Sequence, residues 1–452
     1  MTSTTRSSER TLAFLLAACG LAGILFLACD DASDEPEDSD QTGTIAETDP
    51  EEMDDGEPEV ATAPTNAIFE YQDEAVAVEN LKQQFSSWRV DGKTRTFTYD
   101  RSGKAALTSS PAFNITSKHK PVGFAWDDAD RAVALWYPQG VTGLSPDAAD
   151  YPAVLGSTDR RLILASWYSK ATNPNQGVRL SIADITDLKA VTYRHLLLVQ
   201  VTKADSSSTP IAANDPVTIA EVPIHAGGIE VDGNLLFVAD TDNGVRVFDL
   251  NTIFETGSSA NRIGSEGSQL VAFGYRYVVP ETGSYRFTKG APFSSLGVGF
   301  PTNAANGEKI YYTSQYLKKK DSRTPTVYGF HFSAGSFQET PVDTYVPKDN
   351  TGNAVDYSQG VVRINNVLWS SITGQDIYKN SNARLVRSTG VTAGGTSPKG
   401  KGERFRWPHG SEDLYYETTT DYLWCLTEHP LSSAKGKSHQ DRIVFGVKLS
   451  TY

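Results

Sequence analysis

The clearest hydrophobic pattern in the chain lies at residues 225–250 and has the alternation of three short strands. Apolar residues alternate with polar ones around Ile229 and Val231, a continuous apolar run follows, and alternation returns at Val245 and Val247. The segments are separated by Asp-Gly and Asn-Gly dipeptides, which tolerate the positive φ angles of type I′ hairpin turns. The pattern predicts an antiparallel unit of three strands that cannot bury both of its faces alone.

Similar units recur along the chain, each opening with a glycine before an apolar strand. The spacings between these glycines, 88, 69, 63 and 50 residues, are irregular, so the repeat is one of pattern and not of period. Stacking such units around an axis buries both faces, which predicts an all-β fold and a β-propeller. Five blades are expected, with six as the rival if residues 90–136 form a blade of their own and a β-sandwich pair as the structural alternative. The five marker glycines are Gly140, Gly228, Gly297, Gly360 and Gly410.

The segments that flank these units complete the prediction. Residues 66–86 have the pattern of one helix. The first unit has an apolar outer strand at Tyr193–Val201, and Tyr275–Val279 is the matching outer strand of the second. The fifth unit lacks such a strand, so we expect an N-terminal strand at Thr94–Asp100 to close the ring and remove the exposed edges.

Several lines of the sequence resemble known propellers. The stretch GIEVDGNLLFVADTDNGVRVF resembles the blades of NHL and YVTN type propellers. With WYPQGVTG, GYRYVVP and HGSEDL, it also resembles a group of exported bacterial proteins that have no assigned activity. The architecture is similar to that of gluconolactonase-like and paraoxonase-like enzymes, which implies that a channel Ca²⁺ and hydrolysis of lactones or esters are possible.

The N-terminal segment predicts export. Residues 1–28 combine two arginines with an uncharged apolar run, as a secretory signal does, and Cys29 follows like the lipidated residue of a bacterial lipobox. Cys19 is the alternative lipid site, and an uncleaved anchor helix is the alternative to cleavage. We therefore expect an exported, lipid-anchored protein of the cell envelope that meets the membrane through its anchor only.

Charge is distributed very unevenly between the tether and the domain. Residues 29–60 hold fifteen Asp and Glu and no Lys or Arg, which predicts a disordered acidic tether. The domain at residues 61–452 has 39 acids and 39 bases and is therefore neutral, which argues against a nucleic-acid surface. Cys425 is the single cysteine of the domain and lies in an apolar strand pattern, as a buried inert thiol does.

Four polar residues precede the unit glycines and are expected to converge at one mouth of the propeller channel: Gln139, His225, Gln359 and His409. Such a set can bind a small molecule or an envelope partner. Glu412 and Asp413 add two carboxylates, which suit Ca²⁺. The structural alternative is that these residues cap strands and bond buried loops.

Two functions follow from this set. The first is ligand or partner binding at the channel mouth without chemistry. The alternative is a metal-assisted, Ca-type hydrolase of lactones or esters, with His225, His409, Glu412 and Asp413 as candidate catalytic residues. Two other features are set aside: Gly395–Lys401 resembles a phosphate-binding loop but lacks its Ser or Thr, and the aromatic residues fit packing between blades better than stacking on a sugar. The aromatic residues in question are Trp136, Tyr137, Trp167, Tyr168 and Trp407.

Overall fold

The computed structural model describes residues 69–452 with short gaps. The chain divides into a unit of residues 1–34 and a unit of residues 35–452, and every described residue belongs to the second. The expected signal segment, the acidic tether, Cys19 and Cys29 lie outside the described residues. The gaps are at 106, 114, 147, 149, 173, 242, 258–260, 288–292, 301–308, 318–323, 339, 349–351, 374–382, 391–401 and 434–438.

The first two units form antiparallel groups of four strands that share one sheet. From the innermost strand outward, the first unit contains β4 (Trp136–Leu144), β5 (Leu162–Ser169), β6 (Val178–Asp184) and β7 (Thr192–Lys203), and the second contains β9 (Ile229–Asp232), β10 (Leu235–Asp240), β11 (Gly244–Asp249) and β15 (Tyr277–Phe287). The outer strands β7 and β15 pair in parallel at Leu197–Val199 and Val278–Pro280. The expected outer strand of the second unit is therefore displaced: residues 277–280 pair with β7 and with β12 (Phe254–Glu255), and residues 281–286 pair with β11.

The remaining units form three separate sheets among the described residues. The third contains β16 (Gly297–Val298), β17 (Lys309–Ser314), β18 (Val327–Ser333), β19 (Ser336–Phe337) and β20 (Asp343–Tyr345). The fourth contains β21 (Ser358–Ile364), β22 (Val367–Ile372), β23 (Arg384–Thr389) and β24 (Glu403–Arg406). The fifth contains β25 (Ser411–Glu417), β26 (Tyr422–Thr427), β27 (Ile443–Lys448) and β3 (Val122–Ala125).

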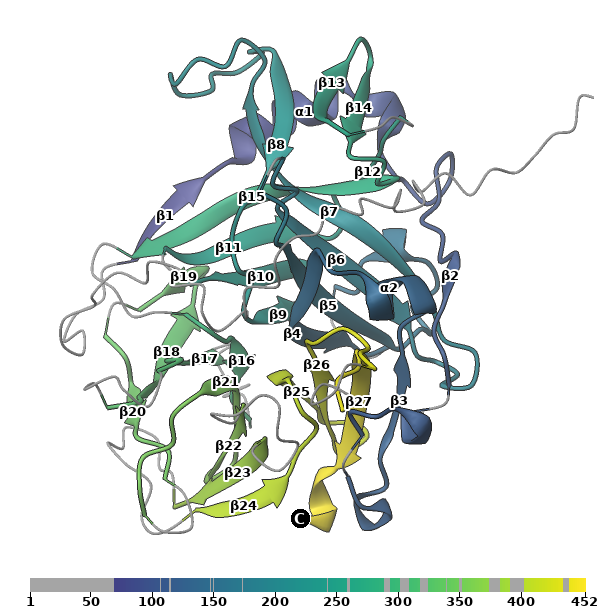
Figure 1. The fold of residues 1–452 in the computed structure, drawn as a ribbon. Helices are drawn as coiled ribbons and strands as arrows, with labels where there is room; N and C mark the ends of the chain where they lie inside the picture. The colour runs from purple at the N-terminus through teal and green to yellow at the C-terminus, as the bar shows by residue number, and fades with distance from the viewer. Residues whose placement is uncertain are drawn as a thin grey trace, which may run out of the picture. The chain divides into compact units, whose positions relative to one another are not determined.

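The innermost strands meet around a common hub. Strand β4 contacts β9, β9 contacts β16, β16 contacts β21, β21 contacts β25, and β25 returns to β4 (Figure 1). The backbones approach closely at the marker glycines. A Cβ atom at Gly140 would lie 2.8 Å from the Ile229 nitrogen, one at Gly228 would lie 2.1 Å from the Leu296 nitrogen, and one at Gly360 would lie 2.6 Å from the Asp413 Cα. Glycine is required there because a side chain would displace the next blade.

The fold is an all-β propeller, as the sequence predicts. The innermost strands contact one another in a closed series, which two stacked layers would not produce, so the β-sandwich alternative is wrong. The number of blades stays a prediction.

The ring closes with an N-terminal strand, but not the expected one. Strand β3 pairs with β27, whereas Thr94–Asp100 has no strand assignment. Strand β3 continues through helix α2 (Asp128–Ala132) directly into β4, so one short segment supplies both the last strand of the fifth unit and the first strand of the first unit. The strand predicted at residues 94–100 is wrong. The alternating pattern there reflects the burial of Phe97 against Tyr277, and no described strand pairs with this segment.

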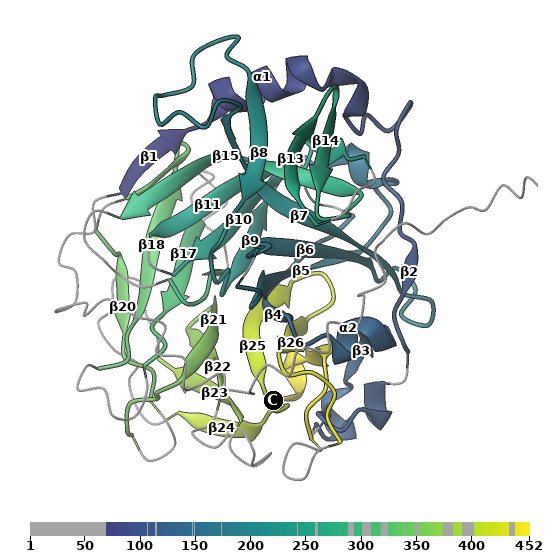
Figure 2. The same cartoon turned by 45° about the horizontal axis from the view of Figure 1, so that its top comes forward.

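The outer edges of β7 and β15 carry the additional elements (Figure 2). The helix expected at 66–86 is instead a strand, β1, which pairs with β15, followed by the shorter helix α1. Short 3-10 helices occupy Ser86–Trp88, Leu107–Ser109, Ser117–His119, Ala153–Leu155 and Leu449–Thr451. The added elements are β1 (Phe69–Asp73), α1 (Ala75–Gln84), β2 (Arg101–Ser102), β8 (Val217–Glu221), β12 (Phe254–Glu255), β13 (Ile263–Glu266) and β14 (Gln269–Ala272).

Buried hydroxyl groups link consecutive units. The Ser166 Oγ donates to the carbonyl of Ala226 at 2.9 Å, the Ser314 Oγ to that of Ser358 at 3.3 Å, and the Ser371 Oγ to that of Ser411 at 3.3 Å. Each serine lies on the second strand of its unit and each acceptor lies on the segment that enters the next. These bonds satisfy main-chain carbonyls that the hub buries away from water. Within the described residues, no helix is long and apolar enough to span a membrane.

Candidate functional site

Three innermost strands carry a β-bulge at the same level of the hub. The pairing register shifts between Pro138 and Val141 in β4, between Ser358 and Gly360 in β21, and between Ser411 and Leu414 in β25. A bulge leaves extra residues outside the ladder and redirects their side chains, and bulges are frequent beside binding sites. The bulged residues with long polar side chains are Gln139, Gln359 and Glu412.

This register corrects the alignment of the units. In the fifth unit the residues equivalent to Gln139-Gly140 are Glu412-Asp413, which lie three positions after His409-Gly410. His225 likewise lies three residues before Gly228. The two histidines are therefore not at positions equivalent to Gln139, although both lie close to the hub.

A hydrogen-bonded chain joins three of the units. The Gln139 side-chain nitrogen donates to Glu428 Oε1 at 3.0 Å, and its oxygen lies 2.7 Å from His225 Nε2. Because the amide oxygen only accepts, the Nε2 of His225 carries the proton. Burial lowers the pKa of His225, and Lys170 lowers it further while Glu428 opposes both. The imidazole is therefore neutral at neutral pH. Although neighbouring atoms desolvate the ring, His225 keeps exposed surface, so it can meet a ligand.

Glu412 lies beneath this chain with little compensation for its charge. The Gln359 side-chain nitrogen donates to Glu412 Oε1 at 3.4 Å. Glu412 is 1% exposed, and burial raises its pKa well above the usual range, with the carboxylates of Glu428 and Asp413 raising it further. Burial thus favours the protonated form of Glu412, whereas Glu428 and Gln359 are only partly buried and can face solvent.

Asp413 and Glu230 bind main-chain groups inside the hub and do not line its mouth. Asp413 Oδ2 accepts from the Val141 and Ile229 nitrogens at 3.3 and 3.2 Å. Glu230 accepts from the Val298 nitrogen at 3.2 Å, and burial raises its pKa to about 7. Each carboxyl thus bonds the main chain of neighbouring units. Asp413 Oδ1 has no hydrogen-bond partner among the described residues, and burial raises the Asp413 pKa well above its usual range.

His409 lies among other histidines. Its ring centroid is 5.3 Å from that of His429 and 4.3 Å from that of His439. His429 is adjacent in sequence to Glu428, which places His409 beside the chain described above. The structure thus joins Gln139 to His225 and Gln359 to Glu412 by direct hydrogen bonds, and it brings His409 near them through His429. Within the described residues, no group of three or more His, Cys, Asp or Glu side chains is arranged to hold a metal ion.

An aromatic surface borders the mouth beside His225. Tyr168 lies 4.4 Å from the His225 ring and 5.8 Å from the Tyr137 ring, and both tyrosines are half-buried. Trp136, Trp167 and Trp407 are at most 6% exposed, which agrees with the predicted role in packing. The tyrosines differ from them because part of each ring remains accessible. Cys425 is fully buried, and burial raises its pKa, as expected of an inert thiol.

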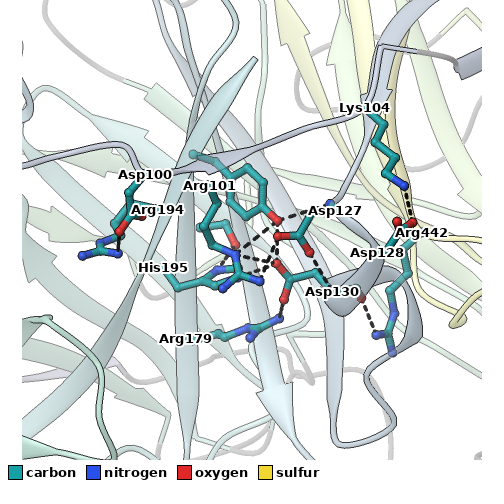
Figure 3. A network of polar contacts seen from close by, with 12 residues as sticks. Asp100, Arg101, Lys104, Asp127, Asp128, Asp130, Arg179, Arg194, His195 and Arg442 are labelled. Carbon is teal, nitrogen blue, oxygen red and sulfur yellow. Dashed lines mark hydrogen bonds and ion pairs between the residues drawn. The ribbon is translucent and has the colours of Figure 1, made fainter. Parts of the chain in front are cut away.

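A second polar cluster was missed by the sequence analysis (Figure 3). Asp130 on α2 accepts from Arg179 Nη2 at 2.9 Å, from the Tyr193 hydroxyl at 2.6 Å and lies 2.9 Å from His195 Nε2. Ser181 Oγ lies 2.7 Å from His195 Nδ1. Burial raises the Asp130 pKa, but His195, Arg179 and Arg101 together hold this pKa well below its usual range.

This cluster is structural, because no member can reach a ligand. Ser181 and His195 are at most 1% exposed, so the Ser-His-Asp contacts have no access to substrate. The available sequence signal was the polar residues inside apolar strands: Arg179 and Ser181 in VRLSIAD, and His195 in YRHLLLV. A buried charge in such a strand requires a partner, and Asp130 provides it.

Comparison with known proteins gives matches among solved structures only. No protein-family model matches the chain, and no curated protein matches it. Among solved structures, a GH93 alpha-L-arabinofuranosidase of Fusarium graminearum in complex with arabinobiose is similar, with 12% identity and a TM-score of 0.28 over 69% of this chain and 92% of that chain.

Proposed function

We propose that the hub mouth binds a small ligand rich in hydroxyl groups. The observation that carries this proposal is the convergence, from separate units, of side chains that can both donate and accept hydrogen bonds. Gln359 offers an amide, Glu428 offers a carboxylate and His225 offers a neutral imidazole, all at least partly accessible. The half-buried ring of Tyr168 beside His225 supplies an apolar face for the ligand's carbon skeleton.

The layer beneath these residues supports them. Gln139 is 2% exposed and fixes both His225 and Glu428, and Glu412 fixes Gln359. A ligand that carries hydroxyl groups can form hydrogen bonds with Gln359, Glu428 and His225 without placing a charge beside Glu412. Such a pre-formed set loses little freedom on binding.

The test is thermal shift and calorimetry of residues 61–452 against monosaccharides, linear polyols and sugar acids, with aliphatic amines of similar size as the contrasting class. We expect stabilisation by a member of the hydroxylated set. Gln359→Leu and Glu428→Gln should weaken it at least tenfold, and Gln338→Leu, at an exposed site, should leave it unchanged. Stabilisation by none of the hydroxylated compounds, or equal binding by the Gln359 and Gln338 variants, overturns the proposal.

The proposal also covers the location of the protein in the cell and the binding of Ca²⁺. We place the protein in the cell envelope, anchored through Cys29, and metabolic labelling with palmitate in Cys29→Ser tests this. Undiminished label moves the site to Cys19 or removes it. Calcium binding near Glu412 and Asp413 stays a prediction. Metal analysis of the purified chain and its melting temperature with and without EDTA decide it.

A further inference from the structure

The outer edge of the fourth unit concentrates positive charge in an otherwise balanced domain. Residues 376–406 contain seven Lys and Arg against two acids, a net charge of +5. The domain as a whole, residues 61–452, has 39 of each sign. Among the described residues of this range, four arginines lie on β23 and β24, namely Arg384, Arg387, Arg404 and Arg406, and β24 lies at the periphery of the ribbon in both views (Figures 1 and 2).

Two arginines on these strands face each other directly. Arg384 on β23 is the antiparallel partner of Arg406 on β24, and like charges at such paired positions destabilise a sheet. Burial lowers the pKa of Arg384, and Arg404 and Arg406 lower it further. The one acid on the two strands, Glu403, already pairs with Arg387.

No described carboxylate compensates this pair. Among the described residues, the hydrogen bond of the Arg384 guanidinium goes to the Ala383 carbonyl at 2.7 Å. Arg404 and Arg406 are exposed. The guanidinium group is planar and presents paired N–H donors that match phosphate oxygens. The repulsion between two facing like charges at an exposed edge is reduced when an anion binds between them.

We propose that the basic edge formed by the facing Arg384 and Arg406 docks the domain on an anionic phospholipid surface. The membrane placement rests on the proposed lipid anchor, because an anchored domain stays within reach of the headgroups. Each arginine near such a surface contributes measurable attraction, and the contribution falls with salt. The hub mouth takes no part in this contact, so the two proposals fail independently.

The experiment is vesicle flotation of the soluble chain Asp30–Tyr452. Vesicles of phosphatidylcholine with phosphatidylglycerol are compared with pure phosphatidylcholine at low and high salt. We expect binding to the anionic vesicles alone, weakened by salt. Arg384→Gln with Arg406→Gln should reduce it on the order of tenfold. The matched control, Lys118→Gln with Lys189→Gln, removes two exposed charges elsewhere and should bind like the wild type.

Equal binding by the arginine variant and the control variant overturns the docking surface, and so does the absence of binding to anionic vesicles. Binding that appears only after residues 30–60 are removed also overturns it and assigns the basic edge to the acidic segment of the same chain. Melting temperatures of both variants separate a folding defect from a lost contact. Removing the two facing charges should raise the melting temperature rather than lower it.

Discussion

The Nη1 atom of Arg442 donates a hydrogen bond of 2.9 Å to the backbone carbonyl of Asp130, 312 residues earlier in the chain. The same guanidinium donates to the carbonyls of Val133 at 2.6 Å and Glu428 at 2.9 Å. Arg442 is fully buried, and burial lowers its pKa to about 10. This side chain therefore connects the segment that leads into β4 with the fifth unit and with the loop that carries Glu428.

Replacing Arg442 should lower the free energy of unfolding, because this side chain holds these segments together. Arg442→Met leaves three buried carbonyls without their donor, and we expect a loss of about 3 kcal/mol or more. Thermal or urea unfolding measures it. Arg276→Met is the control, since Arg276 is largely exposed and pairs with Glu255 at the surface, where such pairs contribute at most about 1 kcal/mol. Similar stability of the two variants would contradict the role assigned to Arg442.

A methyl group at a hub glycine should separate two blades. A Cβ at Gly228 would lie 2.1 Å from the Leu296 nitrogen, so Gly228→Ala requires the backbone of β9 or its neighbour to move. We expect a loss of about 3 kcal/mol or failure to fold. Gly335→Ala, at φ 75° with open space around it, should cost about 1 kcal/mol from backbone conformation alone. Circular dichroism and unfolding midpoints compare the two, and an equal cost would rule out steric closure.

The Glu412 carboxyl should make stability fall with rising pH. Its raised pKa means that the folded chain keeps a proton which the unfolded chain releases above about pH 4.3. Its stabilising contribution is complete below that pH and is lost as the pH rises toward the folded pKa. Glu412→Gln mimics the neutral form, so the variant should be more stable than the wild type at pH 8, by about 1–2 kcal/mol, and equal to it near pH 4.

Unfolding midpoints of wild type and variant across this range provide the measurement. Glu230 titrates in both proteins, so the difference reports Glu412 together with its coupling to the neighbouring Glu428 and Asp413. Glu79→Gln, at an exposed site on α1, should show no pH-dependent difference. A Glu412 variant that is less stable than the wild type at pH 8 would show that this carboxyl is ionised and paired.

Cys425 should resist thiol reagents in the folded chain. Burial raises its pKa, and the side chain has no exposed surface. The chain Asp30–Tyr452 should react with a thiol reagent only after unfolding in urea. Ser157→Cys, introduced at an exposed position, should react at once and calibrate the assay. Fast labelling of Cys425 in native buffer would mean that the fifth unit opens.

The sequence predicted the unit boundaries well because glycine is physically required where inner strands meet. Gly140, Gly228, Gly297 and Gly360 all lie against the next backbone. The prediction failed for the fifth unit because Asp413, and not a glycine, occupies the corresponding position. Gly410 therefore marks the fifth unit in the sequence pattern, which predicts His409 as the residue equivalent to Gln139 and Glu412 only as a metal ligand and a catalytic candidate.

The sequence pattern gives little indication of the other parts of the site. Glu428 follows β26 and joins Gln139 only because the ring closes, 289 residues apart. The choice of closing strand failed for a similar reason: Thr94–Asp100 alternates as a strand does, but Val122–Ala125 leads straight into β4 and has the shorter path to β27. Alternation reports burial on one side and does not report which neighbour supplies the hydrogen bonds.

The parallel pairing of β7 with β15 has a consequence for how the ring can deform. Their shared hydrogen bonds join the first two units in one sheet, whereas the sheets of the other units are separate among the described residues. We therefore expect a motion that widens the hub to displace the other units relative to the first two. Gln139 and His225 would then keep their relative positions, while Gln359 could shift to accommodate a ligand.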